Sequence, residues 1–218
     1  MSGLRRRAWV AHFSLGVIVG FASGISGSAA AAAGSPVILV VGDSLSAEYG
    51  LKAGDGWVAL LQKRVAEQKK PYRVVNASIS GDTSSGGRSR LPAALRTHKP
   101  AIVIIELGGN DALRGLPLAS TRDNLAAMAR AAQDAGAKVV VVGMQVPPNY
   151  GTAYGKEFAG LFDQVAKDHH AALVPFLLKG VAERPDVADW FQPDRIHPLA
   201  KAHPLMLDNV WPALKPLL

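Results

Sequence analysis

The 218-residue chain contains no cysteine. Without thiols it can form no disulfide framework, and its N-terminus cannot be anchored through a lipid-modified cysteine. The hydrophobic core must therefore hold the fold together unaided. Hydrophobic residues make up 49% of the chain and charged residues 19%, a balance that predicts one globular domain with a sizeable buried core.

A strong excess of charge is also missing. The formal net charge of +7 falls to +4 when the three arginines of residues 1–33 are left out, and the remaining charges are spread along the chain. Such a distribution predicts no nucleic-acid partner and no charged membrane-binding surface. The histidines His98, His169 and His170 have no recognisable metal-ligand spacing, so we expect no metal site and no cofactor.

The N-terminus has the pattern of a targeting segment. Three consecutive arginines precede a mainly apolar stretch, residues 8–25, which is followed by small residues. This order predicts a secretory signal peptide over residues 1–33, cleaved near Ala31 to Gly34, and one mature domain over residues 34–218. We expect an exported protein, periplasmic or secreted, with no stable membrane insertion after cleavage. The alternative is an uncleaved membrane anchor, because the apolar stretch is rather long.

The stretch Val37–Ser46, which reads VILVVGDSLS, begins as a buried strand. Its first five residues are apolar, four of them are β-branched, and Pro36 and Gly42 bound the run. A continuous run of this kind fits a strand covered on both faces, in the middle of a parallel sheet. Ligands bind beyond the carboxyl ends of such strands, so Asp43 and Ser44 would lie where chemistry is done.

Strand and helix patterns alternate along the rest of the chain. This alternation requires right-handed crossovers and places helices on both faces of a parallel sheet, so the predicted class is α/β. The helix that starts near Asp82 is expected to be poorly formed before Arg90, because Gly86 and Gly87 interrupt it. The further strands are predicted at 72–77, 101–107, 138–142 and 173–176, and the other helices at 55–69 with Asp55 as cap, 121–135, 155–170, 177–183 and from 199 onward.

Four polar clusters stand at predicted strand ends and before the last helix. Each has a structural explanation on its own, because glycine, serine, aspartate and asparagine are common in turns and caps. Together, in loops that can converge at one edge of a sheet, they provide every part of an acyl-transfer site. The clusters are Gly42-Asp43-Ser44-Leu45, Ser80-Gly81-Asp82, Gly108-Gly109-Asn110-Asp111 and Asp194-Arg195-Ile196-His197.

The clusters supply distinct chemical groups. Ser44 is the candidate nucleophile, and His197 is the base that would take its proton. Asp194, three residues before the histidine, can fix the imidazole tautomer and stabilise the imidazolium. The backbone N–H groups of Ser44 and Gly81 and the side-chain amide of Asn110 can hold the tetrahedral oxyanion.

These clusters resemble the four blocks of the GDSL, or SGNH, hydrolase family, whose second name gives its Ser, Gly, Asn and His. The family's residues fall on Ser44, Gly81, Asn110 and His197, and the Asp of its last block falls on Asp194. The stretches VVNASISGDTS, IELGGNDALRG and VPPNYG are similar to those of the family's exported bacterial acyl-CoA thioesterases, lysophospholipases and arylesterases. The likeness covers nearly all of the chain beyond the predicted signal peptide.

The resemblance implies a three-layer α/β/α sandwich with a five-stranded parallel, flavodoxin-like sheet. It also implies a serine esterase or thioesterase that hydrolyses arylesters, acyl-CoA or lysophospholipids through an acyl-enzyme at Ser44, and we expect a monomer. The sequence lacks the second glycine of a G-x-S-x-G elbow and any HGGG motif, which argues against the larger α/β-hydrolase fold. Two positions depart from the family: Arg195 stands where glycine is common, and His203 where glutamine is common.

Further residues and functions stay open. We expect Asp43 to be structural, holding the turn after the first strand. A carbohydrate acetylesterase on the same fold is the main alternative function. A flavodoxin-like protein that holds a phosphate at the hydroxyl-rich loop is a second alternative, but such a site has no use for Asn110 or for an Asp–His pair. The candidates for an apolar acyl-binding groove are Leu45, Tyr49, Leu113, Pro147, Tyr150 and Tyr154.

Overall fold

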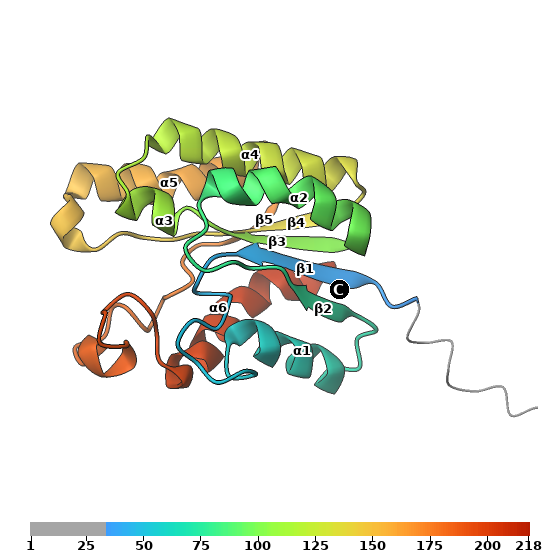
Figure 1. The fold of residues 1–218 in the computed structure, drawn as a ribbon, viewed down its shortest axis with the longest axis horizontal. Coiled ribbons are helices and arrows are strands. Elements are labelled where there is room, and N and C mark those ends of the chain that lie inside the picture. The colour runs from blue at the N-terminus through green and yellow to red at the C-terminus, as the bar shows by residue number, and fades with distance from the viewer. Residues whose placement is uncertain (1–33) are drawn as a thin grey trace, which may run out of the picture. The chain divides into compact units, whose positions relative to one another are not determined.

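The computed structural model describes residues 34–218, so the predicted signal peptide over residues 1–33 lies outside the described part. At its centre is a parallel sheet of five strands in the order β2-β1-β3-β4-β5 (Figure 1). This is the flavodoxin-like order, and the predicted fold class is confirmed. The strands are β1 (Val37–Gly42), β2 (Arg73–Asn76), β3 (Ile102–Glu106), β4 (Lys138–Val142) and β5 (Ala172–Val174).

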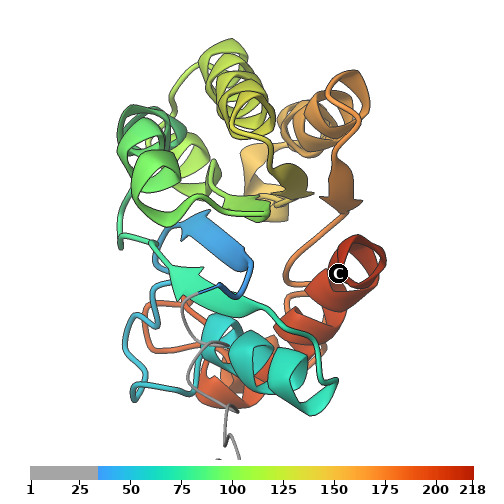
Figure 2. The same ribbon diagram turned by 90° about the vertical axis from the view of Figure 1, so that its right-hand side faces the viewer.

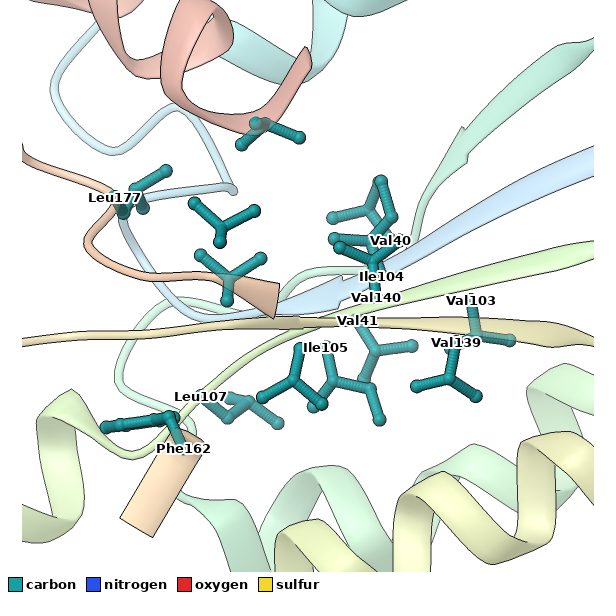
Figure 3. Close-up of a cluster of buried hydrophobic side chains, with 14 of the residues drawn as sticks. Val40, Val41, Val103, Ile104, Ile105, Leu107, Val139, Val140, Phe162 and Leu177 are labelled. Carbon is teal, nitrogen blue, oxygen red and sulfur yellow. The ribbon is translucent and has the colours of Figure 1, made fainter. Parts of the chain in front are cut away.

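The central strands are buried along almost their whole length. Val40, Ile104 and Val140 are neighbours in register across β1, β3 and β4. Figure 3 shows these three side chains on one face of the sheet, with Val41 and Ile105 on the opposite face. A strand with both faces covered has no polar alternation, which is why β1 and β3 read as continuous apolar runs.

Helices cover both faces of the sheet, α2, α4 and α5 on one side and α1 and α6 on the other (Figures 1 and 2). α4 packs against α2 and α5, and α1 packs against α6, which makes the three predicted layers. None of these described helices is both long and apolar enough to cross a bilayer. The helices are α1 (Trp57–Glu67), α2 (Ser84–His98), α3 (Gly109–Leu113), α4 (Leu118–Asp134), α5 (Thr152–Asp168) and α6 (His203–Leu214), with short 3-10 segments at Pro148–Tyr150, Val187–Trp190, Ala200–Ala202 and Lys215–Leu217.

The expectation that α2 is poorly formed before Arg90 is wrong, because the helix is continuous from its first residue. Its two glycines have packing reasons. A Cβ atom at Gly87 would collide with Leu107 Cδ1, and one at Gly86 would collide with Asp82 Oδ1. Tertiary packing therefore selects glycine at two positions where helix propensity disfavours it.

The helix predicted at 177–183 is also absent, since these residues form turns. The side-chain amide of Asn209 donates to the carbonyls of Leu177 and Lys179, both at 2.9 Å, so these carbonyls bond to α6. Gly180 lies in the left-handed region with φ +73°, which a right-handed helix does not accommodate.

Asp55 does not cap α1, whose first N–H groups bond to residues far along the chain or in the preceding loop. The Trp57 N–H donates to His203 Nδ1 at 3.0 Å, and the Gly56 N–H donates to Glu48 Oε1 at 2.9 Å. Burial lowers the pKa of His203, which keeps Nδ1 unprotonated and able to accept. His203 therefore joins the start of α6 to the start of α1.

Candidate active site

The four predicted clusters meet at the carboxyl edge of the sheet. Ser44 follows β1, Gly81 follows β2, Asn110 lies in the first turn of α3 directly after β3, and His197 comes from the segment between β5 and α6. β1 and β3 flank the point where the strand order reverses, which is where ligands bind in sheets of this topology. The fold brings together residues as far as 153 positions apart.

A chain of hydrogen bonds links three of the predicted residues. His197 Nδ1 lies 2.7 Å from Asp194 Oδ2, and His197 Nε2 lies 2.8 Å from Ser44 Oγ. A carboxylate only accepts, so Nδ1 carries the proton and donates it, and Nε2 accepts from the Ser44 hydroxyl. The imidazole is thus held in the tautomer that can remove the serine proton.

Asp194 is held in place by the backbone of its own turn. Its Oδ1 accepts from the N–H groups of Ile196 at 2.9 Å and His197 at 3.0 Å. Desolvation raises the pKa of Asp194, but the hydrogen bonds from these two N–H groups and from the His197 side chain outweigh it and lower the pKa to about 2. Asp194 therefore faces the imidazole as a carboxylate.

The segment that carries His197 is fastened to the loop that carries Ser44. The Gln192 N–H donates to the His197 carbonyl at 2.7 Å, and the Gln192 side-chain amide donates to the Tyr49 carbonyl at 2.9 Å. The Tyr49 ring lies against the imidazole, with ring centroids 4.4 Å apart. These contacts restrict rotation of the imidazole away from Ser44.

Gly81 is the third residue of a tight turn that the Asp82 N–H closes by donating to the Ile79 carbonyl at 3.1 Å. Its φ of +78° is the left-handed value that a type II turn requires there and that glycine adopts without strain. Within residues 34–218, neither the Gly81 N–H nor the Ser44 N–H donates to a protein acceptor. Both N–H groups are therefore free to bind an oxyanion.

The Asn110 side chain lies between two acceptors. Its Nδ2 donates to Asp43 Oδ2 and to the Asp82 carbonyl, both at 3.0 Å. These bonds orient the amide and occupy both of its N–H groups. Because a neutral carbonyl is a weaker acceptor than a carboxylate, we expect the N–H group that bonds to Asp82 to be shared with an oxyanion when one binds.

Two buried carboxyls support the turn that carries Ser44. Asp43 Oδ1 accepts from the Leu45 N–H at 3.0 Å, as expected for a residue that holds this turn. Glu106 ends β3, and its Oε2 lies 2.6 Å from Ser46 Oγ and 3.4 Å from the Asp43 nitrogen. Burial raises the pKa of Asp43 to about 6 and raises the pKa of Glu106 well above its usual range, which favours a neutral, protonated Glu106 beneath the turn.

Three of the groove candidates lie close to the clusters. Tyr49 is 49% exposed and Leu113 is 47% exposed, and both stand in segments that follow Ser44 and Asn110, where a substrate can contact them. Leu45 is only 8% exposed and belongs to the hydrophobic core. Leu45 therefore offers almost no surface to a substrate.

The other three candidates lie in the segment between β4 and α5 and in the first turn of α5. Pro147 lines a hollow of about 330 Å³ together with residues of α5. The rings of Tyr150 and Tyr154 stack with centroids 6.0 Å apart, and Tyr154 stacks on the buried Phe158 at 6.4 Å. Tyr154 therefore covers the core at the start of α5, and Tyr150 stacks on Tyr154.

Three residues that shape the site were not predicted. Glu106 supports the nucleophile turn, Gln192 fastens the histidine segment, and Arg90 binds the residues on either side of the Gly81 turn. Glu106 had one sequence signal, a single acidic residue that closes an apolar strand. Arg90 and Gln192 had none, because polar residues in helices and loops are mostly solvated.

A flavodoxin-like sheet with a Ser–His–Asp hydrogen-bond chain at its carboxyl edge indicates the class, a serine hydrolase. More narrowly, the chain belongs to the GDSL-like lipase/acylhydrolase family, whose model matches residues 40–205. The predicted family is therefore confirmed, and with it the prediction of an enzyme that acts on ester bonds.

Several esterases and thioesterases are similar to this chain over most of their length. The esterase TesA of Pseudomonas aeruginosa is 55% identical over 186 residues, 85% of this chain and 91% of the relative, and a crystal structure of TesA has a TM-score of 0.80 over 84% of this chain and 99% of that chain. The thioesterase 1/protease 1/lysophospholipase L1 of Escherichia coli K12 is 39% identical over 186 residues, 85% of this chain and 86% of the relative. The psychrotrophic esterase EstA from Pseudoalteromonas sp., solved with monoethylphosphonate as inhibitor, is 40% identical with a TM-score of 0.77 over 83% of this chain and 97% of that chain.

Proposed function

We propose that the protein is a serine esterase and thioesterase that works through an acyl-enzyme at Ser44. The observation that carries the proposal is the chain from Ser44 Oγ to His197 Nε2 at 2.8 Å and from His197 Nδ1 to Asp194 at 2.7 Å. A serine hydroxyl is a weak nucleophile until a neighbouring base takes its proton. This arrangement supplies the base in the required tautomer, with a carboxylate behind it.

In acylation, Ser44 Oγ attacks the carbonyl carbon of the substrate while His197 Nε2 removes the hydroxyl proton. The carbonyl oxygen becomes negatively charged and accepts hydrogen bonds from the N–H groups of Ser44 and Gly81 and from the Asn110 amide. His197 then donates its proton to the leaving alcohol or thiol, and the C–O or C–S bond breaks. In deacylation, His197 takes a proton from water, the hydroxide attacks the acyl carbon, and Ser44 leaves and regains the proton.

The exposed apolar side chains beside Ser44 support the proposal that the substrate carries an apolar acyl or aryl group, as arylesters, acyl-CoA and lysophospholipids do. Tyr49 and Leu113 are the side chains best placed to contact such a group. Comparing kcat/KM for acetyl and longer acyl p-nitrophenyl esters and for matched thioesters tests this substrate class. A rate that falls steadily as the acyl chain grows from acetyl would instead indicate an acetylesterase.

Covalent trapping tests the nucleophile. We expect a p-nitrophenyl phosphonate ester to release one p-nitrophenolate per chain and to leave a phosphonyl group on Ser44, identified by peptide mass spectrometry. The His197→Ala chain should react far more slowly, because its serine keeps its proton. An adduct on another residue, or continued ester hydrolysis after Ser44 is fully modified, would contradict the proposal.

We also propose that residues 1–33 direct export to the periplasm or the medium and are then removed, leaving residues 34–218 as a monomer without a nucleic-acid partner or stable membrane insertion. The order of basic, apolar and small residues supports export, and the modest, dispersed charge supports the absence of a nucleic-acid partner. The mass of the exported protein should match a chain that begins near Gly34, and its sedimentation should match one chain. An exported protein that keeps residues 1–33 would contradict the cleavage.

A further inference from the structure

Arg90 of α2 binds three acceptors with one guanidinium group, one at the end of β1 and two in the loop between β2 and α2. Its Nε donates to Asp82 Oδ2 at 2.7 Å, and its Nη2 donates to the Gly42 carbonyl at 3.1 Å. Its Nη1 donates to the Ala77 carbonyl. The side chain of Arg90 is 22% exposed and that of Asp82 13%, so these bonds are largely shielded from water.

Two of these acceptors lie close in sequence to groups proposed to bind the oxyanion. Gly42 ends β1, two residues before Ser44. Asp82 directly follows Gly81, and its carbonyl accepts from the Asn110 amide at 3.0 Å. The guanidinium is therefore bonded close to the Ser44 and Gly81 N–H groups and is linked through Asp82 to the Asn110 amide.

The third acceptor, the Ala77 carbonyl, lies in the stretch that ties the Gly81 turn to the end of β1. The Ala77 N–H donates to the Val40 carbonyl at 2.8 Å, and the Ile79 N–H donates to the Gly42 carbonyl at 3.0 Å. Gly42 thus accepts from both Ile79 and Arg90. The arginine completes a set of bonds that fixes where the turn lies relative to the strand.

We propose that Arg90 is a positioning residue that sets the spacing of the three oxyanion donors: the N–H groups of Ser44 and Gly81 and the amide of Asn110. This inference rests on the proposed function of the site. A guanidinium is planar and presents its donors in a rigid fork, so three simultaneous bonds fix the relative positions of their acceptors. A misplacement of about 1 Å in an active site can lower the rate about 10²-fold.

The glycine one turn before Arg90 is consistent with this role. A Cβ atom at Gly86 would collide with Asp82 Oδ1. The absence of a side chain at Gly86 therefore leaves space for the Asp82 carboxylate to reach Arg90. Gly86→Ala is expected to displace Asp82 while keeping the arginine.

Kinetics of Arg90 variants test the role, because loss of spacing weakens binding of the transition state rather than of the substrate. Arg90→Gln should lower kcat for a p-nitrophenyl ester about 10- to 100-fold with KM nearly unchanged. Arg90→Lys should show most of that loss, because lysine keeps the charge but not the fork. The matched control is Arg88→Gln on the same helix, whose exposed guanidinium bonds to Asn124 and which should keep the wild-type kcat.

A double-mutant cycle with Asn110→Ala separates positioning from a general loss of structure. Arg90→Gln should cost at least about 3-fold less in the Asn110→Ala chain than in the wild-type chain, because one of the donors that it positions is already gone. An equal cost in both chains overturns the inference. A wild-type kcat in folded Arg90→Gln or Arg90→Lys overturns it as well.

Thermal unfolding shows which variants are folded. Where Arg90→Gln does not fold, Arg90→Lys and Gly86→Ala undergo the same kinetic test. Ser44→Ala distinguishes this inference from the proposed function, because wild-type turnover in Ser44→Ala would contradict the proposed function itself. An inactive Ser44→Ala beside fully active Arg90 variants would overturn only the role of Arg90.

Discussion

Arg195 lies in the left-handed region with φ +58°, in the turn between Asp194 and His197. In this conformation a residue with a Cβ atom lowers the free energy of unfolding by about 1–2 kcal/mol. Glycine lowers it by about 0.5–1 kcal/mol, because glycine loses more backbone freedom on folding. We expect Arg195→Gly to raise the free energy of unfolding by about 0.5–1 kcal/mol. Arg195→Ala keeps the Cβ atom and should bring no such gain. Urea unfolding checks the pair, and equal stability of the two variants would contradict the expected strain.

Asp43 is a buried carboxyl whose pKa burial raises from 3.8 to about 6. The unfolded chain then loses this proton at lower pH than the folded chain, so the contribution of Asp43 to stability falls as the pH rises from about 4 to about 6. Asp43→Asn removes this dependence. The free energy of unfolding of the variant relative to wild type should therefore rise by about 2 kcal/mol between pH 4 and pH 7.

Urea unfolding of both chains at several pH values measures that difference. Each chain serves as the reference for the other, because groups that titrate alike in both chains cancel. Two curves that run parallel from pH 4 to pH 7 would show that Asp43 titrates normally in the folded protein.

Within α2, the packing of Gly87 opposes its helix propensity. Alanine is favoured over glycine by about 1 kcal/mol in a helix interior, but a Cβ atom at Gly87 would collide with Leu107 in the core, and overpacking costs about 1–3 kcal/mol. We expect Gly87→Ala to lower the melting temperature. Gly160 in α5 has open space around its Cα, so the control Gly160→Ala should raise it. A rise in both variants would show that the helix packs less tightly than described.

The strands could be predicted because each is encoded locally. The runs at 37–41 and 102–105 are apolar and β-branched, and only a buried strand suits such runs at that length. The start of α2 could not be predicted because it depends on packing of Gly87 against Leu107. The turns at 177–183 could not be predicted because their carbonyls bond to the distant Asn209. Local propensity gives way where tertiary packing supplies the stronger interaction.

The site divides in the same way. Residues whose chemistry requires one side chain, such as Ser44, Asn110 and His197, stood out in the sequence through their order and neighbours. Residues that act by holding the backbone, Arg90 and Gln192, did not, because a guanidinium or an amide can serve a carbonyl from many places in the chain. Only the fold reveals which carbonyls they reach.

At the scale of the whole molecule, the strand order assembles the site. β1 and β3 are adjacent, so Ser44 and Asn110 emerge side by side, and β2 brings Gly81 to the other flank of β1. The last cluster arrives from beyond the opposite edge strand, and His197 reaches Ser44 only because its segment is bonded back to the loop after β1. The proposed triad therefore forms only when the C-terminal segment packs against the loop after β1.

The turnover of Ser44→Ala tests the central claim, nucleophilic catalysis by Ser44, most directly. The Ser44 hydroxyl forms a hydrogen bond with His197 Nε2, and the variant without this hydroxyl has no nucleophile to form the proposed acyl-enzyme. The measurement is kcat for a p-nitrophenyl acyl ester, with thermal unfolding of the same sample to confirm that the variant is folded. We predict a fall of about 10⁴-fold or more. A folded variant that hydrolyses the ester at near wild-type rate would contradict the claim.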